Sequence, residues 1–296
     1  MKTYHLIAIA TLLLAACGTK EKEYDATGTF EATEVTVSAE QNGRLLQFDV
    51  VEGNRLEAGQ QAALIDTVQL YLKAQQMGMT KQIYATQRPD TRKQIAATRQ
   101  QLAKAQQEVA RYSALVEEGA ANRKILDDAK NQVQVLERQL EAQQSSLSNS
   151  TQSLNAQIST TDIQRNQILD QLQKCHILAP ITGTVLEKYT ELGEFVTIGK
   201  PLFKLANTDN MFLRAYITSQ QLKDVKVGQQ VKIFTDYGNG ERKEYNGRVT
   251  WISSRSEFTP KTILTDDERA DLVYAVKIAV KNDGYIKIGM YGEVKL

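Results

Sequence analysis

The sequence predicts an elongated, multidomain α+β protein. A long antiparallel coiled-coil hairpin of α-helices interrupts a small β-sandwich, and a small antiparallel β-barrel follows. Three observations support this prediction: an N-terminal apolar segment that ends in cysteine, two copies of a glycine pattern set 140 residues apart, and a glycine-poor heptad pattern between the copies.

The composition already excludes several classes of function. The chain has 296 residues, with 36 Lys+Arg against 35 Asp+Glu, so the basic surface of a nucleic-acid-binding protein is not expected. It has 2 His and 2 Cys, and one of each, His5 and Cys17, belongs to the N-terminal segment. Cys175 and His176 remain, too few for a His/Cys zinc site, a disulfide framework or a His-based catalytic triad. We therefore expect no enzymatic activity, no metal and no cofactor.

Residues 1–16 are predicted to be the signal peptide of a bacterial lipoprotein. The apolar run Leu6–Ala16 is shorter than the about 20 residues that a membrane-spanning helix needs, and it is typical of a secretory signal. It ends in the lipobox-like sequence LAAC, so Cys17 is the expected site of lipidation. Residues 17–33 would then form a lipidated tether and the first barrel strand. The alternative is a plain signal peptide that happens to end in cysteine.

The glycine pattern occurs twice and predicts two halves of one β-sandwich, residues 34–67 and 173–208. Each copy reads A-x3-G-x-[LV], then G-x2-[LV]-x2-G, followed by an apolar strand. Glycine allows positive φ in tight turns between short strands. The glycines predicted to form these turns are Gly43, Gly53 and Gly59 in the first half and Gly183, Gly193 and Gly199 in the second.

Each half alone resembles half of a biotinyl or lipoyl carrier domain. In such carriers a tight hairpin joins the halves and presents the modified lysine. Here residues 68–172 take the place of that hairpin, and Lys174 lacks the usual Met-Lys-Met-like frame. A carrier that swings a cofactor is therefore the weaker interpretation, and the halves are expected to form a lipoyl-like structural scaffold.

Residues 68–172 are predicted to form an α-helical hairpin. They contain two of the 17 glycines, and their apolar positions alternate in steps of three and four, as in a coiled-coil seam. The outgoing seam is Ile95, Thr98, Leu102, Ala105, Val109, Tyr112 and Val116, and the return seam is Leu126, Ala129, Val133, Leu136, Leu140, Gln143, Leu147, Ser150 and Leu154. Nearer the base we expect the seam to continue through Leu72, Gln75, Met79 and Ile83, and then through Ile158, Ile168 and Leu172.

The tip of the hairpin is predicted at residues 117–123. Gly119 is a suitable C-cap for the outgoing helix and Asn122 a suitable N-cap for the return helix. Pro89 should break the outgoing arm, and the serine-rich segment 145–151 lies opposite, so two stacked segments with a weak point between them are expected. At about 1.5 Å per residue, arms of about 50 residues reach roughly 75 Å.

A docking patch is predicted beside this tip. Arg111 and Leu115 lie one helical turn apart, and Leu115 is off the seam set by the neighbouring apolar residues. The alternative is that Leu115 is an exposed leucine without a role.

Residues 209–296 are predicted to form the barrel. Short alternating runs at 212–217, 230–234, 247–252 and 272–278 indicate antiparallel strands, with a short helix at 219–225. A last strand near 289–296 closes the barrel, and residues 25–37 can supply a strand from the N-terminal side.

This arrangement resembles the HlyD-like membrane fusion proteins, or periplasmic adaptors. Adaptors that dock on TolC carry Arg, Leu four residues later and Ser eleven later, often followed by Asp and Ala. Arg111, Leu115, Asn122, Asp127 and Ala129 match that spacing, with Asn122 where the family has Ser. The stretch Ser256–Thr262, with Glu268-Arg269 and Leu272-Val273-Tyr274, resembles the YbhG-like adaptors of ABC exporters.

The resemblance implies a subunit that does no chemistry. It would bridge an inner-membrane transporter to a TolC-like outer-membrane channel in the periplasm of a Gram-negative bacterium, with six copies together, anchored to the inner membrane by lipid. The chain has no room after the barrel for the further domain typical of RND-pump adaptors, which favours an ABC-type transporter. The alternative is an envelope lipoprotein scaffold whose coiled coil binds other partners without forming a conduit.

Overall fold

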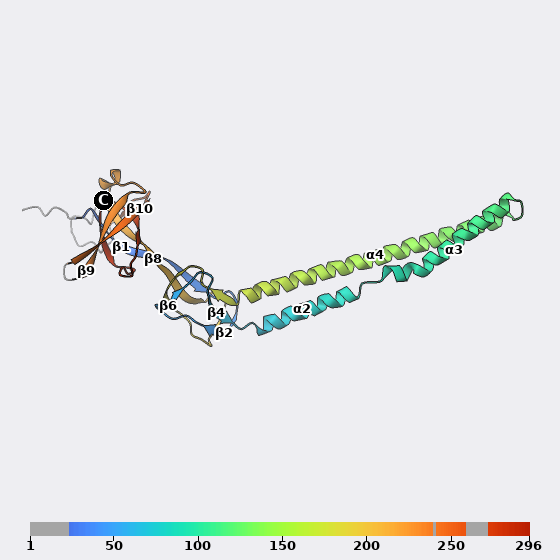
Figure 1. Ribbon diagram of the computed structural model, residues 1–296, viewed down its shortest axis with the longest axis horizontal. Coiled ribbons are helices and arrows are strands. Elements are labelled where there is room, and N and C mark those ends of the chain that lie inside the picture. The colour runs from blue at the N-terminus through green and yellow to red at the C-terminus, as the bar shows by residue number, and fades with distance from the viewer. Residues whose placement is uncertain (1–23, 239–240, 259–271) are drawn as a thin grey trace, which may run out of the picture. The chain divides into compact units, whose positions relative to one another are not determined.

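The computed structural model describes residues 24–238, 241–258 and 272–296 (Figure 1). The chain divides into two compact units, one made of the residues up to Leu64 together with Ile177–Leu296, the other of Ile65–His176. The first unit consists mainly of strands and the second almost entirely of helices, so the predicted α+β class with a hairpin, a split sandwich and a barrel is confirmed. The predicted signal peptide and Cys17 lie outside the described residues.

The split sandwich takes its strands from both sides of the helical region. One sheet has the order β5-β4-β2-β7, made of β5 (His176–Leu178), β4 (Gln61–Ile65), β2 (Gly43–Phe48) and β7 (Phe195–Val196). In the facing layer, β3 (Arg55–Leu56) pairs with β6 (Gly183–Lys188), which pairs in turn with β8 (Pro201–Thr218). Leu45, Val185, Val196 and Leu205 are almost fully buried, which gives the sandwich its apolar core.

The two halves of the sandwich complete each other's turns. The N–H of Gly53 donates to the carbonyl of Val185 across 2.9 Å. At the matching positions 140 residues apart, the N–H of Gly193 donates to the carbonyl of Leu45 across 3.0 Å. Each half therefore supplies the acceptor that the other half's turn requires, which relates the two halves by an approximate two-fold axis.

A second reciprocal set joins the next turn of each half. The N–H of Gly59 donates to the carbonyl of Ala179, and the N–H of Gly199 donates to that of Ala39, both across 2.8 Å. The four glycines of these two sets have φ between +83° and +87°, where a side chain would be strained.

Gly183 has a different role from the predicted turn. It begins β6 without positive φ, and a Cβ there would lie 2.4 Å from the carbonyl oxygen of Ala206. Glycine is needed at this position because β6 and β8 approach closely, which spacing alone does not distinguish from a turn. Its counterpart Gly43 likewise begins a strand, β2.

The barrel has six strands and is closed. Its order is β12-β10-β9-β13-β1-β8, and β12 pairs back to β8. The strands are β1 (Ala26–Ser38), the second part of β8, β9 (Gln230–Gly238), β10 (Glu241–Ile252), β12 (Leu272–Lys281) and β13 (Tyr291–Lys295), with the 3-10 helix η2 (Gln221–Lys223) and the short strand β11 (Glu257–Phe258) beside them. Phe30, Leu213, Ile233 and Ile278 fill the core.

The hairpin consists of α2 (Val68–Thr86), α3 (Thr91–Glu117) and α4 (Arg123–Gln173). Asp90 caps α3, its side chain accepting the N–H of Lys93 across 3.2 Å, so the break falls around Pro89 as predicted. The expected weak point at residues 145–151 is wrong, because α4 is one continuous helix of 51 residues. Thr151 donates to the Leu147 carbonyl across 2.8 Å, which keeps its hydroxyl satisfied inside the helix.

The predicted seam of α2 is also wrong. Leu72, Met79 and Ile83 are exposed, whereas Ala74 is buried and Lys81 bonds Asp162 on α4 across 2.8 Å. Lys81 and Ala74 precede Ile95 by two and three heptads. The positions that face α4 therefore keep the same heptad phase across the break, although in α2 large apolar side chains do not occupy them. The contact face of α2 is therefore small and polar, and its apolar stripe faces away from α4.

Within the part of the chain that the structure describes, no helix combines the length and the apolar character needed to cross a membrane.

Candidate functional site

The tip of the hairpin is a compact turn between α3 and α4. The N–H of Ala120 donates to the carbonyl of Leu115 across 2.8 Å, and that of Gly119 donates to Val116 across 3.1 Å. With Gly119 at φ +71°, these two bonds form a Schellman motif, which satisfies carbonyls that the helix end leaves open. The predicted C-cap role of Gly119 is confirmed.

Asn122 starts the return helix. Its backbone is extended, with φ −81° and ψ 136°, and its side-chain oxygen accepts the N–H of Lys124 across 3.0 Å. The predicted N-cap role is confirmed. Serine caps a helix in the same way, so Asn122 can replace the serine of the family pattern without opening the turn.

Arg111 is held along the surface of α3. Its guanidinium pairs with Glu108, one turn earlier, and donates to the hydroxyl of Tyr112 across 3.2 Å. The guanidinium carbon also lies 4.9 Å from the centre of the Tyr112 ring. These contacts restrict the side chain while leaving the cation largely exposed, which suits it to meet a carboxylate or carbonyl group on a partner.

Leu115 is half-buried rather than fully exposed, so it contributes only one edge of an apolar surface. The more exposed apolar residue at the tip is Ile125, with 45% of its surface accessible, across the turn in the first turn of α4. Asp127 is exposed on α4 two residues beyond Ile125. The sequence analysis missed Ile125, although its place just off the seam, beside Leu126, was a usable signal.

We name this set of residues, Arg111, Leu115, Asn122, Ile125 and Asp127, the tip surface. It joins one cation, one carboxylate and two aliphatic side chains around a turn whose backbone is fixed by its own caps. Small-molecule sites are concave, whereas these side chains lie around the exposed turn of a hairpin, so the surface suits contact with another protein better. It is the candidate site for such a contact.

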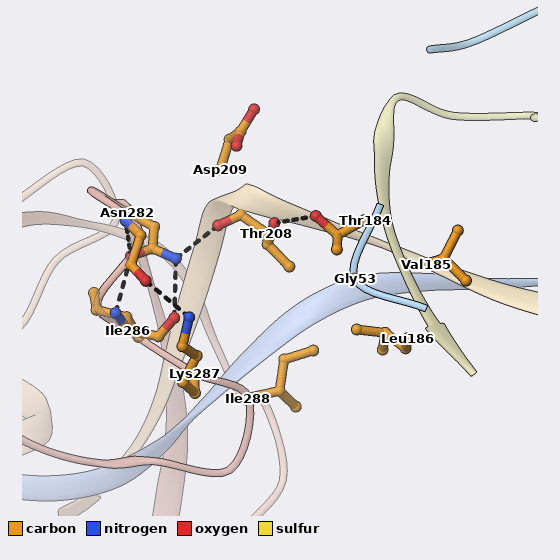
Figure 2. Close-up of a pocket in the computed structure, with 11 residues that line it drawn as sticks. Gly53, Thr184, Val185, Leu186, Thr208, Asp209, Asn282, Ile286, Lys287 and Ile288 are labelled. Atoms are coloured by element: carbon orange, nitrogen blue, oxygen red, sulfur yellow. Dashed lines mark hydrogen bonds between the residues drawn. The ribbon is translucent and has the colours of Figure 1, made fainter. Parts of the chain in front are cut away.

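A second feature is a cavity of about 570 Å³ inside the first unit, between the turns of the sandwich and the loop that follows β12 (Figure 2). The amide of Asn282 donates to the carbonyl of Thr208 across 2.8 Å and to that of Ile286 across 3.0 Å. Asn282 therefore ties β8 to the β12–β13 loop at the point where the chain passes from sandwich to barrel.

Beside this cavity a bidentate ion pair joins the sandwich to β8. Arg55 in β3 contacts the two carboxylate oxygens of Asp209 at 2.9 and 2.6 Å. The hydrogen bond from Arg55 lowers the pKa of the Asp209 carboxyl below its ordinary value. Both side chains are about half exposed, so the pair orients the junction more than it stabilises it.

The barrel end nearest this cavity has a cluster of aromatic and charged side chains. Lys243 pairs with Asp283 at 2.5 Å and lies 5.2 to 5.6 Å from the ring centres of Tyr237, Tyr245 and Tyr285. The Lys243 hydrogen bond lowers the pKa of Asp283 to about 2. The cluster fixes the β9–β10 hairpin to the loop after β12.

Cys175 is fully buried, and its thiol donates to the Gln171 carbonyl across 3.4 Å. Burial raises the pKa of that thiol, which disfavours a reactive thiolate. Among the described residues, no three His, Cys, Asp or Glu side chains gather as they would around a metal ion.

Known proteins share this architecture. The family described as "RND MFP, barrel-sandwich hybrid domain" matches residues 33–208. A UPF0194 membrane protein of Yersinia pseudotuberculosis is 38% identical over 120 residues, 40% of this chain and 36% of the relative. The UPF0194 membrane protein YbhG of Salmonella arizonae is 35% identical over 125 residues, 42% of this chain and 37% of the relative. The matched region thus spans little more than a third of these curated relatives.

Two solved structures have the same fold. MacA from Actinobacillus actinomycetemcomitans, at 21% identity, aligns over 91% of this chain and 76% of its own with a TM-score of 0.56. A MacA–MexA chimera that contains the α-hairpin domain of Pseudomonas aeruginosa MexA, at 22% identity, aligns over 91% and 78% with a TM-score of 0.50. With the family match over more than half of its length, the chain belongs to the HlyD-like membrane fusion proteins, the adaptors that carry a barrel-sandwich hybrid domain.

Proposed function

We propose that this adaptor bridges an inner-membrane ABC-type transporter and a TolC-like outer-membrane channel in the periplasm of a Gram-negative bacterium. In this proposal several copies, six by resemblance to the family, surround a conduit. Cys17 carries the lipid that holds each copy to the inner membrane. The protein itself does no chemistry and frames the path of the substrate.

The observation that supports the proposal most is the capped tip of the hairpin. The helix α4 alone has 51 residues, which at 1.5 Å per residue is about 75 Å. A helix pair of that length has only a narrow apolar seam, and its distal surface is the tip surface defined above. A long spacer that ends in a rigid, mixed-polarity turn suits contact with a second protein at a distance.

The choice of an ABC-type transporter rests on the resemblance of Ser256–Thr262 to YbhG-like adaptors. Most of that stretch lies outside the described residues, so the choice depends on sequence alone. The similarity to the curated YbhG protein supports the same branch of the family.

The test is a substitution at the tip surface in a strain that depends on this adaptor for export. We expect Leu115→Ser together with Arg111→Ala to reduce export at least tenfold, while Asn122→Ser, which keeps the cap, leaves export unchanged. The matched control is Val135→Ser, since Val135 is also exposed on the hairpin but lies about three turns from the start of α4. Circular dichroism of each purified variant should show unchanged helix content.

Cross-linking separates the proposal from the scaffold alternative. A photoreactive residue at position 121, in the tip turn, should capture a TolC-like channel in the parent and not in the doubly substituted variant. Full export by that variant, with no channel captured, would instead favour an envelope scaffold. Membrane anchoring is tested separately, because Cys17→Ala should move the protein from the membrane to the soluble fraction.

A further inference from the structure

The helix α2, which is described in full, carries an apolar stripe that its own hairpin leaves uncovered. Ala74 and Lys81 face α4, and the stripe lies on the opposite side of the helix. At about 100° per residue, its members fall within an arc of about 60°. We name them the α2 stripe; each is more than half exposed, and they are Val68, Leu72, Met79 and Ile83.

The rest of the outgoing arm shows that such a stripe is not a general property of this hairpin. α3 is longer than α2, yet none of its large apolar side chains is exposed. α3 has seven charged residues among 27, whereas α2 has two among 19, Lys73 and Lys81. Lys81 pairs with Asp162, and Lys73 lies about 110° around the helix from the centre of the stripe. The α2 stripe is therefore uncharged as well as apolar, which is typical of a surface that another protein covers.

The surface that matches the α2 stripe best is the same stripe of a second copy. Of the large apolar side chains exposed on α4, which is also described in full, Ile163 alone lies at the level of α2, beside Asp162. Packing α2 on the α4 of a second copy would therefore cover the stripe mostly with polar side chains. Two α2 stripes instead cover apolar side chains with apolar ones, and neither stripe brings a charge to the contact.

We propose that α2 of one copy packs on α2 of a second copy in a parallel, two-fold contact through the α2 stripe. The inference rests on the proposed function, because copies that the lipid at Cys17 anchors to one membrane have the same polarity and the same height. Each stripe residue then lies opposite its own counterpart, Leu72 against Leu72 and Met79 against Met79. Each α4 stays on the far side of its own α2, so the intramolecular hairpin is unchanged.

The size of the contact sets its strength. A helix of 19 residues is about 28 Å long and about 10 Å wide, so the contact covers on the order of 300 Å² per copy. A stable complex buries about 800 Å² per partner. Pairing through α2 is therefore weak between free molecules and is favoured between copies that a membrane holds at high local concentration. Covalent trapping on the membrane is the suitable measurement.

The experiment traps the contact as a disulfide in the full-length protein on its membrane. In Met79→Cys, oxidation should join two copies, because equivalent positions on the two helices come within the about 7 Å between Cα atoms that a disulfide requires. The matched control is Ile163→Cys, since Ile163 is as exposed as Met79 and lies at the same level on α4. It should give at least about fivefold less dimer. The parent, in which Cys175 is buried, provides the background.

Mixtures of two variants test the geometry of the contact. Leu72 and Ile83 are 11 residues apart, about 16 Å along the helix, so Leu72→Cys should not form mixed dimers with Ile83→Cys. Mixed dimers of these two variants would mean antiparallel pairing and overturn the proposal. Mixed dimers of Met79→Cys with Ile163→Cys would assign the α2 stripe to the α4 of a second copy and overturn it as well.

A disruptive variant completes the test. Leu72→Glu with Met79→Glu places carboxylates in the contact and should reduce trapping through Ile83→Cys at least about fivefold, with unchanged helix content by circular dichroism. Undiminished trapping, or no dimer above the parent's background in any stripe variant, would overturn the proposal. These results are separate from the test of bridging, because export and channel capture by the tip surface do not depend on a disulfide at α2.

Discussion

The two halves of the barrel-sandwich share a backbone but differ in surface. Their turns use the same glycines and the same reciprocal hydrogen bonds, 140 residues apart. In the first half, Arg55 pairs with Asp209 and Glu52 accepts the N–H of Lys188 across 3.0 Å. At the matching positions the second half has Phe195 and Leu192, exposed by 65% and 60%.

This difference separates the residues that the backbone conformation requires from the side chains that are free to differ at the surface. Glycine at the turns is required by φ, so both halves keep it. The side chains around those turns are under no such requirement, and the first half uses them to fix the junction with β8. In the second half, Glu191 and Glu194 pair with Lys188 and Lys200, while Leu192 and Phe195 are exposed, which suits these two apolar side chains to contact another molecule.

The strongest test of the shared backbone is Gly183→Val. A Cβ at this position would meet the Ala206 carbonyl oxygen at 2.4 Å, and backbone atoms cannot move away as a flexible side chain can. We expect the free energy of unfolding to fall by about 3 kcal/mol or more, as in severe overpacking. Chemical denaturation of the full chain measures it, and a loss below about 1 kcal/mol would show that β6 and β8 can separate.

The next test asks whether the halves are equivalent. Gly53→Ala and Gly193→Ala each place a side chain at positive φ in open space, since no atom lies within 4 Å of either Cβ position. Both should lower the free energy of unfolding by about 1–2 kcal/mol, and by the same amount. Unequal losses from the two substitutions would contradict the approximate two-fold symmetry. Denaturation curves for the pair provide the measurement.

The smallest effect should come from the side chains that distinguish the halves. Arg55→Met should cost about 0.5–1 kcal/mol, because an exposed ion pair contributes little. Phe195→Ser should leave the free energy of unfolding nearly unchanged while weakening self-association of the intact protein, which analytical ultracentrifugation detects. A large loss of stability in Phe195→Ser would mean that this side chain belongs to the core instead.

The stability difference between the parent and the Arg55→Met variant should also change with pH. Because Arg55 lowers the pKa of folded Asp209 below its unfolded value of about 3.9, the pair stabilises the protein above that pH. This contribution disappears as pH falls through the lowered pKa. The stability difference between parent and Arg55→Met should therefore shrink on acidification from pH 5 to pH 2, which denaturation across that range can test.

The sequence predicted the elements whose signal is local. Gly119 and Asn122 are capping residues in the sequence and in the structure, because a cap depends on its immediate neighbours. The strands of the barrel coincide with the short alternating runs, whereas their order, with β9 beside β13 and β12 beside β8, depends on pairing between distant segments. The resemblance to membrane fusion proteins, built on these elements, is confirmed by the family match over residues 33–208.

The errors concern features that depend on more distant partners. The face of α2 follows the heptad phase set by α4, so it buries Ala74 and exposes Met79 against the preference of the side chains themselves. The role of Gly183 depends on Ala206, 23 residues later, and the half-buried state of Leu115 depends on how the turn folds. Ile125 is a different case, because its place beside the seam residue Leu126 already indicated an exposed apolar side chain.

Where the hairpin leaves and re-enters the sandwich, β4 and β5 pair, and the N–H of Ile65 donates to the carbonyl of Cys175 across 2.9 Å. The inserted arms therefore begin and finish side by side, whatever length lies between them. Adding seven residues to each arm would lengthen the spacer by about 10 Å and return the chain to the same closing bond in the same phase. Reach is thus a quantity that evolution, or an engineer, can adjust without redesigning the rest of the molecule.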